Sequence, residues 1–225
     1  NELEDFSGVD HPLVKALVAC YQGKYEEADL IFDHNLKAYR QNPIYWTQVA
    51  NCFLKKDNKR KALLYYNKAK ELRANYAPPI NNIGVILERK DQPQKALKAY
   101  EEAMRIASFS LTPLFNSAGL FVRYGLVHEA ESSLKSLIDL EKDDIDTISS
   151  LAYMEMIKGD YKQSLVYYNM MSRSDRSNNP RIAVNYAYSL YLFGNKKRAK
   201  SVINSISYEK KDDLSDYILQ IKKLL

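Results

Sequence analysis

The sequence predicts an all-α protein assembled from repeated helix pairs, and three observations support this. Apolar and small residues recur with a period of 34 residues through six repeats, the last of them after a single-residue insertion. The seven prolines all fall at expected helix starts, where the missing N–H costs little. A turn-forming residue stands fifteen residues into every repeat, at Gly23, Asp57, Asp91, Gly125, Gly159 and Gly194. We therefore expect one helix before this residue and one after it.

The predicted chain consists of six repeats and two end segments. The repeats cover residues 10–42, 43–76, 77–110, 111–144, 145–179 and 180–211. Residues 1–9 form an N-terminal lead segment. Residues 212–225 form a capping helix, because Leu214, Ile218 and Ile221 recur there at helical spacing. One helix pair cannot bury its own apolar face, whereas a stack with polar ends can.

Composition excludes several classes of protein. The 225 residues are 46% hydrophobic and 27% charged, which is ordinary for a soluble globular chain. The net charge of +5 is mild and does not by itself indicate nucleic acid. The longest uncharged stretch, residues 106–122, contains Pro113 and Asn116, so we expect no membrane span. Two cysteines are too few for a disulfide framework or for a zinc site of their own.

Side-chain size within each repeat suits closely packed helices. Small residues at the eighth position let helices approach: Ala50, Gly84, Ala118, Ala152 and Ala187. Larger residues fill the space to the next repeat, among them Trp46, Phe53, Tyr66 and Tyr100. This pattern resembles the tetratricopeptide repeat family over roughly residues 10–211, which implies a right-handed superhelical α-solenoid. The runs 81–84 and 116–119 are also similar to tetratricopeptide repeat lipoproteins that help bacterial pili assemble.

No group of residues has the spacing of a catalytic or metal site. The histidines His11, His34 and His128 fall in three different predicted helices, without a Cys or carboxylate at ligand spacing. We therefore expect no enzymatic activity, no cofactor and no metal. A regulatory domain of a larger enzyme stays open as an alternative.

The cysteines and the first residue bear on the compartment. Cys20 and Cys52 occupy late first-helix positions in adjacent repeats, and we predict two free, buried thiols. A disulfide between them stays open if the protein is periplasmic. The chain begins at Asn1 rather than Met, so a signal peptide, lipid anchor or upstream domain also stays open. The cytoplasm and the bacterial periplasm are both compatible with the sequence.

The resemblance implies that the first helices line a concave groove. The groove positions hold an amide ladder flanked by cations and, toward the C-terminus, a tyrosine-rich surface. These residues are Asn51, Lys55, Asn81, Asn82, Arg89, Asn116, Arg123, Tyr153, Asn185, Tyr188 and Tyr191. Because an amide both donates and accepts hydrogen bonds, a row of asparagines suits the backbone of a partner segment. The alternative is that the asparagines are solvated or bridge neighbouring helices.

The carboxylate clamp of chaperone-binding members of the family is incomplete in this chain. Asn51 and Asn82 occupy the two asparagine positions of the clamp, but Thr47, Thr112 and Asn116 stand where it requires cations. A C-terminal carboxylate would find too little positive charge. We therefore expect no binding to heat-shock chaperones.

A basic edge provides the alternative to the groove. Ten Lys or Arg and two acids lie between Lys37 and Arg73, and several of the cations gather around one turn: Lys55, Lys56, Lys59, Arg60 and Lys61. Such an edge over residues 55–73 could bind nucleic acid or an anionic surface. Nucleic acid is disfavoured because the turn itself lacks aromatic residues for stacking. We predict a scaffold that binds an extended or helical protein segment in the groove, within a bacterial pilus, secretion or motility assembly. The sequence indicates no oligomeric state.

Overall fold

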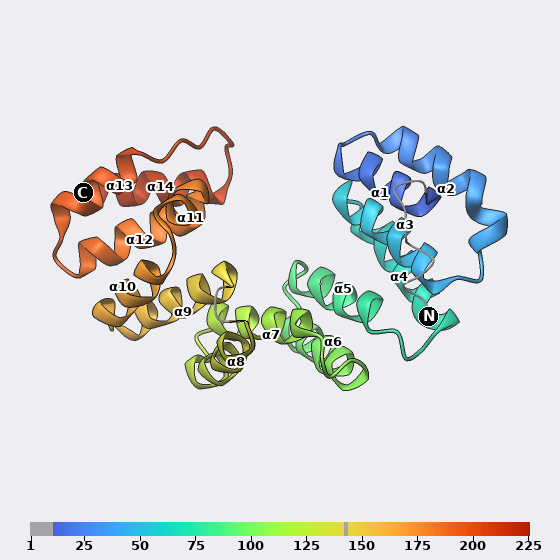
Figure 1. Cartoon of the computed structure of the whole chain (residues 1–225), viewed down its shortest axis with the longest axis horizontal. Helices are drawn as coiled ribbons and strands as arrows, with labels where there is room; N and C mark the ends of the chain where they lie inside the picture. Colours follow the sequence, from blue (N-terminus) through green and yellow to red (C-terminus); the bar gives the residue numbers. More distant parts are fainter. Residues whose placement is uncertain (1–10, 142–143) are drawn as a thin grey trace. The chain divides into compact units, whose positions relative to one another are not determined.

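The computed structural model describes residues 11–141 and 144–225, and all regular structure in these ranges is helical (Figure 1). The predicted lead segment 1–9 lies outside the described residues. Contacts between Cα atoms divide the chain after Pro113 into two compact units, which we call the N-terminal half and the C-terminal half. Helix α7 (Leu111–Arg123) begins just before this division.

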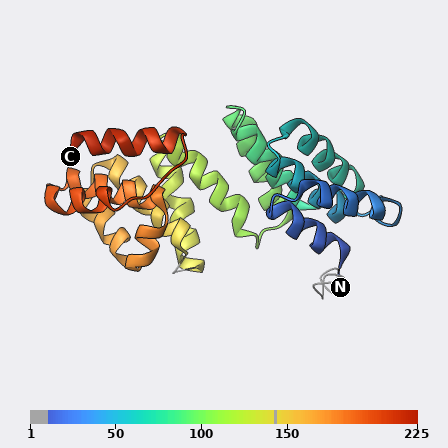
Figure 2. The same ribbon diagram turned by 90° about the horizontal axis from the view of Figure 1, so that it is seen from above.

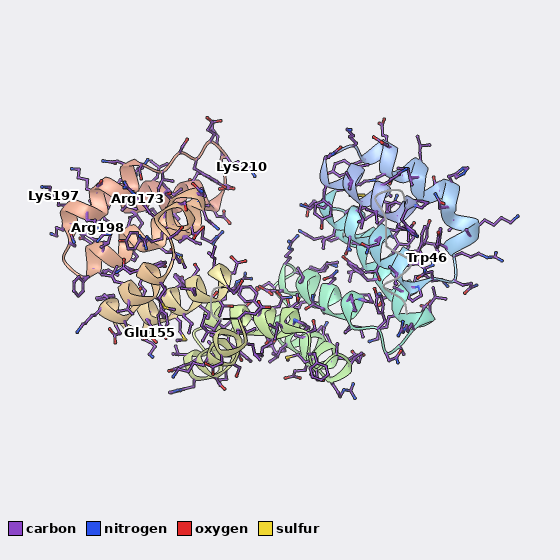
Figure 3. All side chains as sticks on the ribbon, in the orientation of Figure 1. Trp46, Glu155, Arg173, Lys197, Arg198 and Lys210 are labelled. Carbon is purple, nitrogen blue, oxygen red and sulfur yellow. A yellow bond between two sulfur atoms is a disulfide. The ribbon has the colours of Figure 1, made fainter. Side chains whose placement is uncertain are left out.

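The N-terminal half consists of three antiparallel helix pairs. The pairs are α1 (Pro12–Tyr21) with α2 (Tyr25–Tyr39), α3 (Pro43–Lys55) with α4 (Lys59–Leu72), and α5 (Ala77–Glu88) with α6 (Pro93–Ile106). Tyr66 and Tyr100 are fully buried, and Trp46 stacks on Tyr65 with its ring nitrogen donating to the carbonyl of Arg40 (Figure 3). A Cβ on Gly84 would lie 2.5 Å from Cε1 of Tyr100. The small residue at the eighth position is therefore required by this contact.

The C-terminal half repeats the same arrangement with two additions. Its helices are α7, α8 (Val127–Leu140), α9 (Ile145–Lys158), α10 (Tyr161–Met170), α11 (Arg173–Asn178), α12 (Pro180–Leu192), α13 (Lys196–Asn204) and α14 (Asp213–Leu224). Helix α9 pairs with α10 and α12 with α13. Helix α14 packs on α12 and α13, where Ile218 and Ile221 are buried against Val184 and Ile203 (Figure 2).

Helix α11 is an element that the sequence analysis did not anticipate. Helix α10 ends at Met170, and the Ser172 hydroxyl then accepts a hydrogen bond from the backbone N–H of Asp175 at 3.1 Å. This cap starts the short helix α11 within the repeat that precedes the single-residue insertion. The repeat 145–179, which is one residue longer than the period, therefore contains this additional short helix before the next repeat begins.

The turns between paired helices agree with the prediction at every repeat. Four glycines have φ between 70° and 95°, and two aspartates have φ of 55°: Gly23, Gly125, Gly159, Gly194, Asp57 and Asp91. Such a backbone conformation is strained for most side chains and open to glycine. The prolines also open helices as expected, with α1, α3, α6 and α12 each beginning at one.

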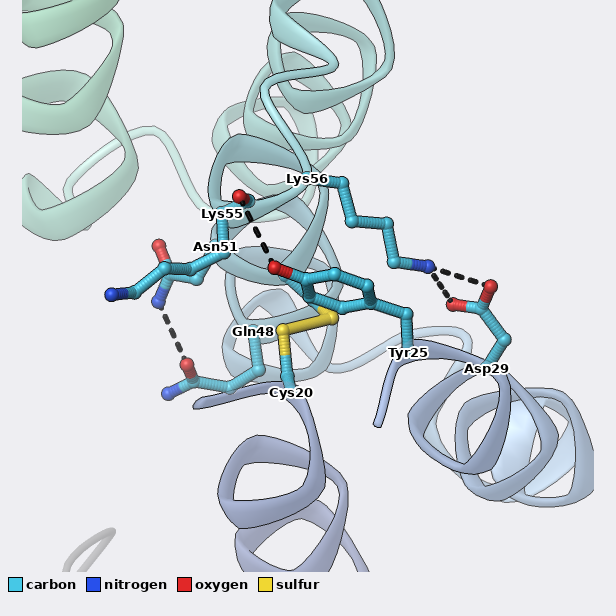
Figure 4. The surroundings of a disulfide bond; sticks show 8 residues. Cys20, Tyr25, Asp29, Gln48, Asn51, Lys55 and Lys56 are labelled. Atoms are coloured by element: carbon cyan, nitrogen blue, oxygen red, sulfur yellow. Dashed lines mark hydrogen bonds and ion pairs between the residues drawn. A yellow bond between two sulfur atoms is a disulfide. The ribbon is translucent and has the colours of Figure 1, made fainter. Parts of the chain in front are cut away.

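The prediction of two free thiols is wrong, because Cys20 and Cys52 form a disulfide (Figure 4). Helices α1 and α3 pack directly against each other, and this brings the two Cα atoms to 5.7 Å. Both cysteines are 1% exposed. The bond therefore links the first helices of two adjacent repeats inside the core of the N-terminal half.

Among the described residues, no helix combines the length and the apolar character needed to cross a bilayer.

Candidate functional site

The predicted amide ladder of the N-terminal half is a closed hydrogen-bonded cluster. The Tyr66 hydroxyl donates to Asn51 Oδ1 at 2.6 Å, and Asn82 Nδ2 donates to the same oxygen at 3.0 Å. Asn51 Nδ2 donates in turn to Gln48 Oε1 at 2.8 Å, and Asn81 Nδ2 donates to Asn82 Oδ1 at 3.1 Å. We call these residues the amide cluster. It joins α3, α4 and α5, which is the bridging alternative left open by the sequence.

Burial keeps the Tyr66 hydroxyl of this cluster in its protonated form. Desolvation of Tyr66 raises the pKa of its hydroxyl, and the hydrogen bond with Asn82 offsets only part of that rise. The hydroxyl therefore stays protonated and remains a donor to Asn51. Asn81 is only 6% exposed, so most of its side chain is closed to a partner. An incoming peptide would have to break hydrogen bonds that the cluster already makes.

The cations of the basic edge lie against aromatic rings and carboxylates. Lys56 Nζ lies 2.6 Å from Asp29 Oδ2 (Figure 4). Lys59 Nζ lies 3.4 Å from Asp57 Oδ1. Lys55 Nζ stands 4.7 Å from the centre of the Tyr21 ring. Two of the five cations are thus neutralised. Tyr21 precedes Lys55 by one period of 34 residues, so the repeat register could have located this contact from the sequence.

Aromatic rings around the same turn contact Lys56 a second time and also contact Lys61. Lys56 lies over Phe53 at 4.8 Å, and Lys61 lies over the same ring at 4.9 Å. The Tyr25 hydroxyl donates to the backbone carbonyl of Lys55 at 3.4 Å. Arg60 is exposed and forms no ion pair with any described residue. Part of the edge therefore stabilises the fold, and the charge left for a ligand is smaller than the sequence suggests.

The C-terminal half contains a pocket of about 630 Å³ on the face formed by its first helices. Three of the predicted groove residues line it: Arg123 from α7, Tyr153 from α9 and Asn185 from α12. Ser149, Ser150 and Arg181 stand beside them at the corresponding positions of α9 and α12. Helix α14 completes the wall with Asp213, Leu214 and Tyr217. We call this the C-terminal pocket.

The polar groups of this pocket are less completely paired than those of the amide cluster. Asn185 is 7% exposed, and its Oδ1 has no hydrogen-bond partner among the described residues. Burial raises the pKa of Tyr217 to about 12, with smaller contributions from Tyr153 and Tyr188. The Tyr217 phenol is therefore neutral near pH 7 and can donate a hydrogen bond.

The equivalent positions of the two halves explain this difference. Tyr153 and Tyr168 stand 102 residues, or three periods of 34, after Asn51 and Tyr66. Asn185 follows Asn82 by 103 residues because of the insertion. Where Asn51 supplies the shared acceptor in the N-terminal half, the C-terminal half has a tyrosine. The Tyr168 hydroxyl therefore lacks the acceptor that Tyr66 has. Asn185 Oδ1 lacks a donor among the described residues because Val184 stands at the position equivalent to Asn81, which donates to Asn82 Oδ1.

The remaining predicted groove residues lie outside this pocket. Tyr188 packs against the apolar side of α14, so the expected tyrosine-rich surface is partly covered by the protein's own last helix. Tyr191 stacks with Tyr188 at 6.4 Å and carries Lys196 at 5.7 Å from its ring centre. Asn116 lies on α7, and Arg89 caps α5. The sequence indicated a capping helix but carried no signal for the side chains that it adds to the pocket.

In the described part of the chain no three His, Cys, Asp or Glu side chains are grouped as metal ligands.

Comparison with known proteins relates this architecture to one family. Residues 77–109, which make up nearly all of the third predicted repeat, match the tetratricopeptide repeat family. No curated protein sequence matches the chain significantly. The solved structure of PilW, a widely conserved type IV pilus biogenesis factor, is similar with a TM-score of 0.76 and 17% identity over 86% of this chain and 89% of PilW.

Two further solved structures have the same fold. PilF of Pseudomonas aeruginosa gives a TM-score of 0.74 at 16% identity, over 96% of this chain and 90% of PilF. The hetero-tetramer Cut9-Hcn1 of the APC/C gives a TM-score of 0.75 at 15% identity. That match covers 90% of this chain, which spans only 40% of the length of the matched chain. At these identities the likeness establishes the fold, a stack of tetratricopeptide repeats, and leaves function to be argued from the surfaces.

Proposed function

We propose that this tetratricopeptide repeat chain is a non-catalytic scaffold that binds an extended segment of a protein partner in its C-terminal pocket. The observation that carries the proposal is Asn185, a buried amide whose Oδ1 is unpaired among the described residues and which lines a 630 Å³ pocket. A buried acceptor without a partner is unfavourable. A peptide N–H in the pocket would satisfy it.

The pocket favours an extended segment over a helical one. An extended segment presents free backbone N–H groups, whereas a helix has already used all but its first few. An amide rotates easily about its last bond, so Asn185 can present its oxygen or its nitrogen to such a backbone. Tyr153 and Tyr217 add apolar area with a polar tip, which suits side chains of varied sequence.

Charge around the pocket favours partners with an acidic residue near the bound segment. Arg123 and Arg181 line the pocket, together with one acid, Asp213. Arg181 is exposed and forms no ion pair with any described residue. A carboxylate of the partner could therefore pair with its guanidinium in two parallel hydrogen bonds.

The N-terminal half takes a supporting role in this proposal. Its amide cluster stabilises the stack, because the predicted binding groups Asn51 and Asn82 are bonded to each other and to Tyr66. The basic edge, which includes Lys55, forms a second candidate surface for an anionic ligand. Its Arg60 and Lys61 are exposed and carry positive charge. Ion pairs at Lys56 and Lys59 reduce the charge available there.

The setting that we propose is a bacterial assembly such as a pilus, a secretion system or the motility machinery. The shared fold with PilW and PilF supports a pilus setting. The buried Cys20–Cys52 disulfide supports an oxidising compartment, of which the bacterial periplasm is one. A regulatory role within a larger enzyme stays as the alternative.

Titration with a recovered partner tests the proposed pocket. A partner captured from native extract would be titrated against the wild type, against Arg181→Glu and against Tyr153→Ala. Both changes remove groups of the pocket, and we expect affinity to fall about ten- to a hundredfold.

Arg173→Glu is the matched control, since it reverses another exposed arginine, on α11, that does not line this pocket. Affinity unchanged in Arg181→Glu and Tyr153→Ala, with both proteins folded, would refute the C-terminal pocket as the binding site.

A further inference from the structure

A second pocket lies in the C-terminal half between α10, α12 and α13. Its volume is about 300 Å³, and it shares no lining residue with the C-terminal pocket. Its walls come mainly from the second helices of two repeats and from the end of α12, including Leu165, Leu190 and Asn169. We call it the α10–α13 pocket.

Apolar side chains are exposed at the mouth of this pocket. Val166 is 47% exposed and Phe193 is 53% exposed, and both line it. Met170 follows Val166 by one helical turn on α10 and is 53% exposed. Neighbouring exposed apolar residues of this size are typical of a surface that contacts another molecule.

The two helices on either side of the pocket carry only positive charge. Residues 161–170 and 196–204 contain five Lys or Arg and no Asp or Glu. These cations are Lys162, Lys196, Lys197, Arg198 and Lys200. None of the five forms an ion pair with a residue that the structure describes. Lys162 and Arg198 line the pocket itself, and Figure 3 labels Lys197 and Arg198 on α13.

Arg198 is held at the pocket by a ring. Its guanidinium stands 5.6 Å from the centre of the Tyr186 ring, and that of Arg176 stands 5.4 Å from the same ring. Arg176 is further tied by hydrogen bonds of 2.7 Å to the carbonyls of Tyr168 and Met171. A guanidinium positioned in advance loses less conformational freedom when it binds a carboxylate.

The hydroxyl of Tyr186 supplies an independent observation. Tyr186 lines the pocket, is 3% exposed, and its hydroxyl has no hydrogen-bond partner among the described residues. Buried hydroxyls are nearly always paired. A carboxylate entering the pocket would accept from Tyr186 and from Arg198 together.

We propose that the α10–α13 pocket binds an acidic protein segment in which a bulky apolar residue stands beside Asp or Glu. The apolar side chain contacts Val166 and Phe193, and the carboxylate pairs with Arg198. A nucleic acid has phosphates but no apolar side chain for this rim. A bilayer surface is too flat to enter a pocket. The site is separate from the C-terminal pocket, and either can exist without the other.

Selection of peptides tests this second site without a known partner. A random peptide library displayed on phage would be selected against the whole chain, and the recovered peptides titrated by fluorescence anisotropy. We expect a class of peptides with Asp or Glu next to a bulky apolar residue. Their affinity should fall about tenfold or more in Arg198→Glu and remain unchanged in Arg173→Glu, the matched control at an exposed arginine that lines neither pocket. A peptide whose affinity falls in Arg181→Glu instead is assigned to the C-terminal pocket.

A pair of tyrosine variants distinguishes binding from stability. Tyr186→Phe removes an unpaired hydroxyl, so we expect the fold to be retained while peptide affinity falls several-fold. Tyr168→Phe is the matched control, because Tyr168 also has a buried hydroxyl without a partner among the described residues but does not line the pocket. It should leave peptide affinity unchanged.

Three outcomes would overturn the proposal. One is a selection that yields no acidic peptide, and another is a set of acidic peptides of which none loses affinity in Arg198→Glu. The third is binding of phosphatidylglycerol vesicles or of oligouridylate that depends on Arg198 and exceeds that of the peptides.

Discussion

The same repeat positions carry a closed polar cluster in the N-terminal half and an open pocket in the C-terminal half. In the first, Asn51 Oδ1 accepts hydrogen bonds from both Tyr66 and Asn82. In the second, Tyr153 stands in place of that acceptor and Val184 in place of the donor Asn81, so the Tyr168 hydroxyl and Asn185 Oδ1 are left without a partner among the described residues. Two changes of residue type therefore distinguish the polar cluster that stabilises the stack from the pocket in which we propose that a partner binds.

Removal of the disulfide should produce the largest difference in stability between the two halves. The Cys20–Cys52 bond closes a loop with a sequence separation of 32, for which chain entropy gives about 3–4 kcal/mol of stabilisation. A Cys20→Ser/Cys52→Ser variant should lose amide-exchange protection in α1–α4 by that amount, and α9–α13 should keep theirs. The wild type measured in the presence of a reductant is the control, because it loses the same bond without a change of residue. Equal loss in both halves would show that the two do not open independently.

Removal of the shared acceptor should have the next largest effect. Asn51→Leu leaves the Tyr66 hydroxyl buried without an acceptor and deprives Asn82 of a partner. We expect the N-terminal half to lose about 2–4 kcal/mol of stability, measured by amide exchange in α3–α5.

Tyr153→Leu at the equivalent position of the C-terminal half is the control, and it should cost less stability because the Tyr153 hydroxyl forms no hydrogen bond with a described residue. Equal costs for the two variants would contradict the contrast between the halves.

A matched pair of phenylalanine variants sharpens the comparison. Tyr66→Phe removes a hydroxyl that bonds Asn51 and Asn82, so it should destabilise the N-terminal half by about 1–2 kcal/mol. Tyr168→Phe removes an unpaired buried hydroxyl and should leave stability unchanged or slightly raised. Urea unfolding of both variants, followed by circular dichroism, measures the difference. A larger loss for Tyr168→Phe would mean that its hydroxyl is paired in solution.

The smallest expected effect is a gain. Tyr153→Asn places the missing acceptor at the equivalent position of the C-terminal half. We expect the new Oδ1 to accept hydrogen bonds from the Tyr168 hydroxyl and from Asn185 Nδ2, to add about 1 kcal/mol of stability, and to weaken partner binding by removing a ring of the pocket. The readouts are amide exchange in α9–α12 and titration of a partner. Greater stability with undiminished binding would show that the Tyr153 ring is not used for recognition.

Some features of the candidate site were accessible from the sequence and others were not. The period placed Arg123, Tyr153 and Asn185 on one face, and the structure brings these three to one pocket. The same reasoning expected Asn51 and Asn82 to be available to a partner, yet they bond to each other. The repeat positions alone did not show this pairing, because it also depends on Tyr66, which comes from the second helix between Asn51 and Asn82.

The sequence by itself determined the features that depend on local backbone chemistry. Proline at helix starts, glycine or aspartate at positive φ and a small residue at the eighth position set the helix pairs and their period. Only the tertiary structure decided the Cys20–Cys52 bond, the pairing of each asparagine and the part of the pocket wall that α14 supplies. Those depend on distances between side chains in adjacent repeats, and a difference of a few ångströms separates a bonded amide from a free one.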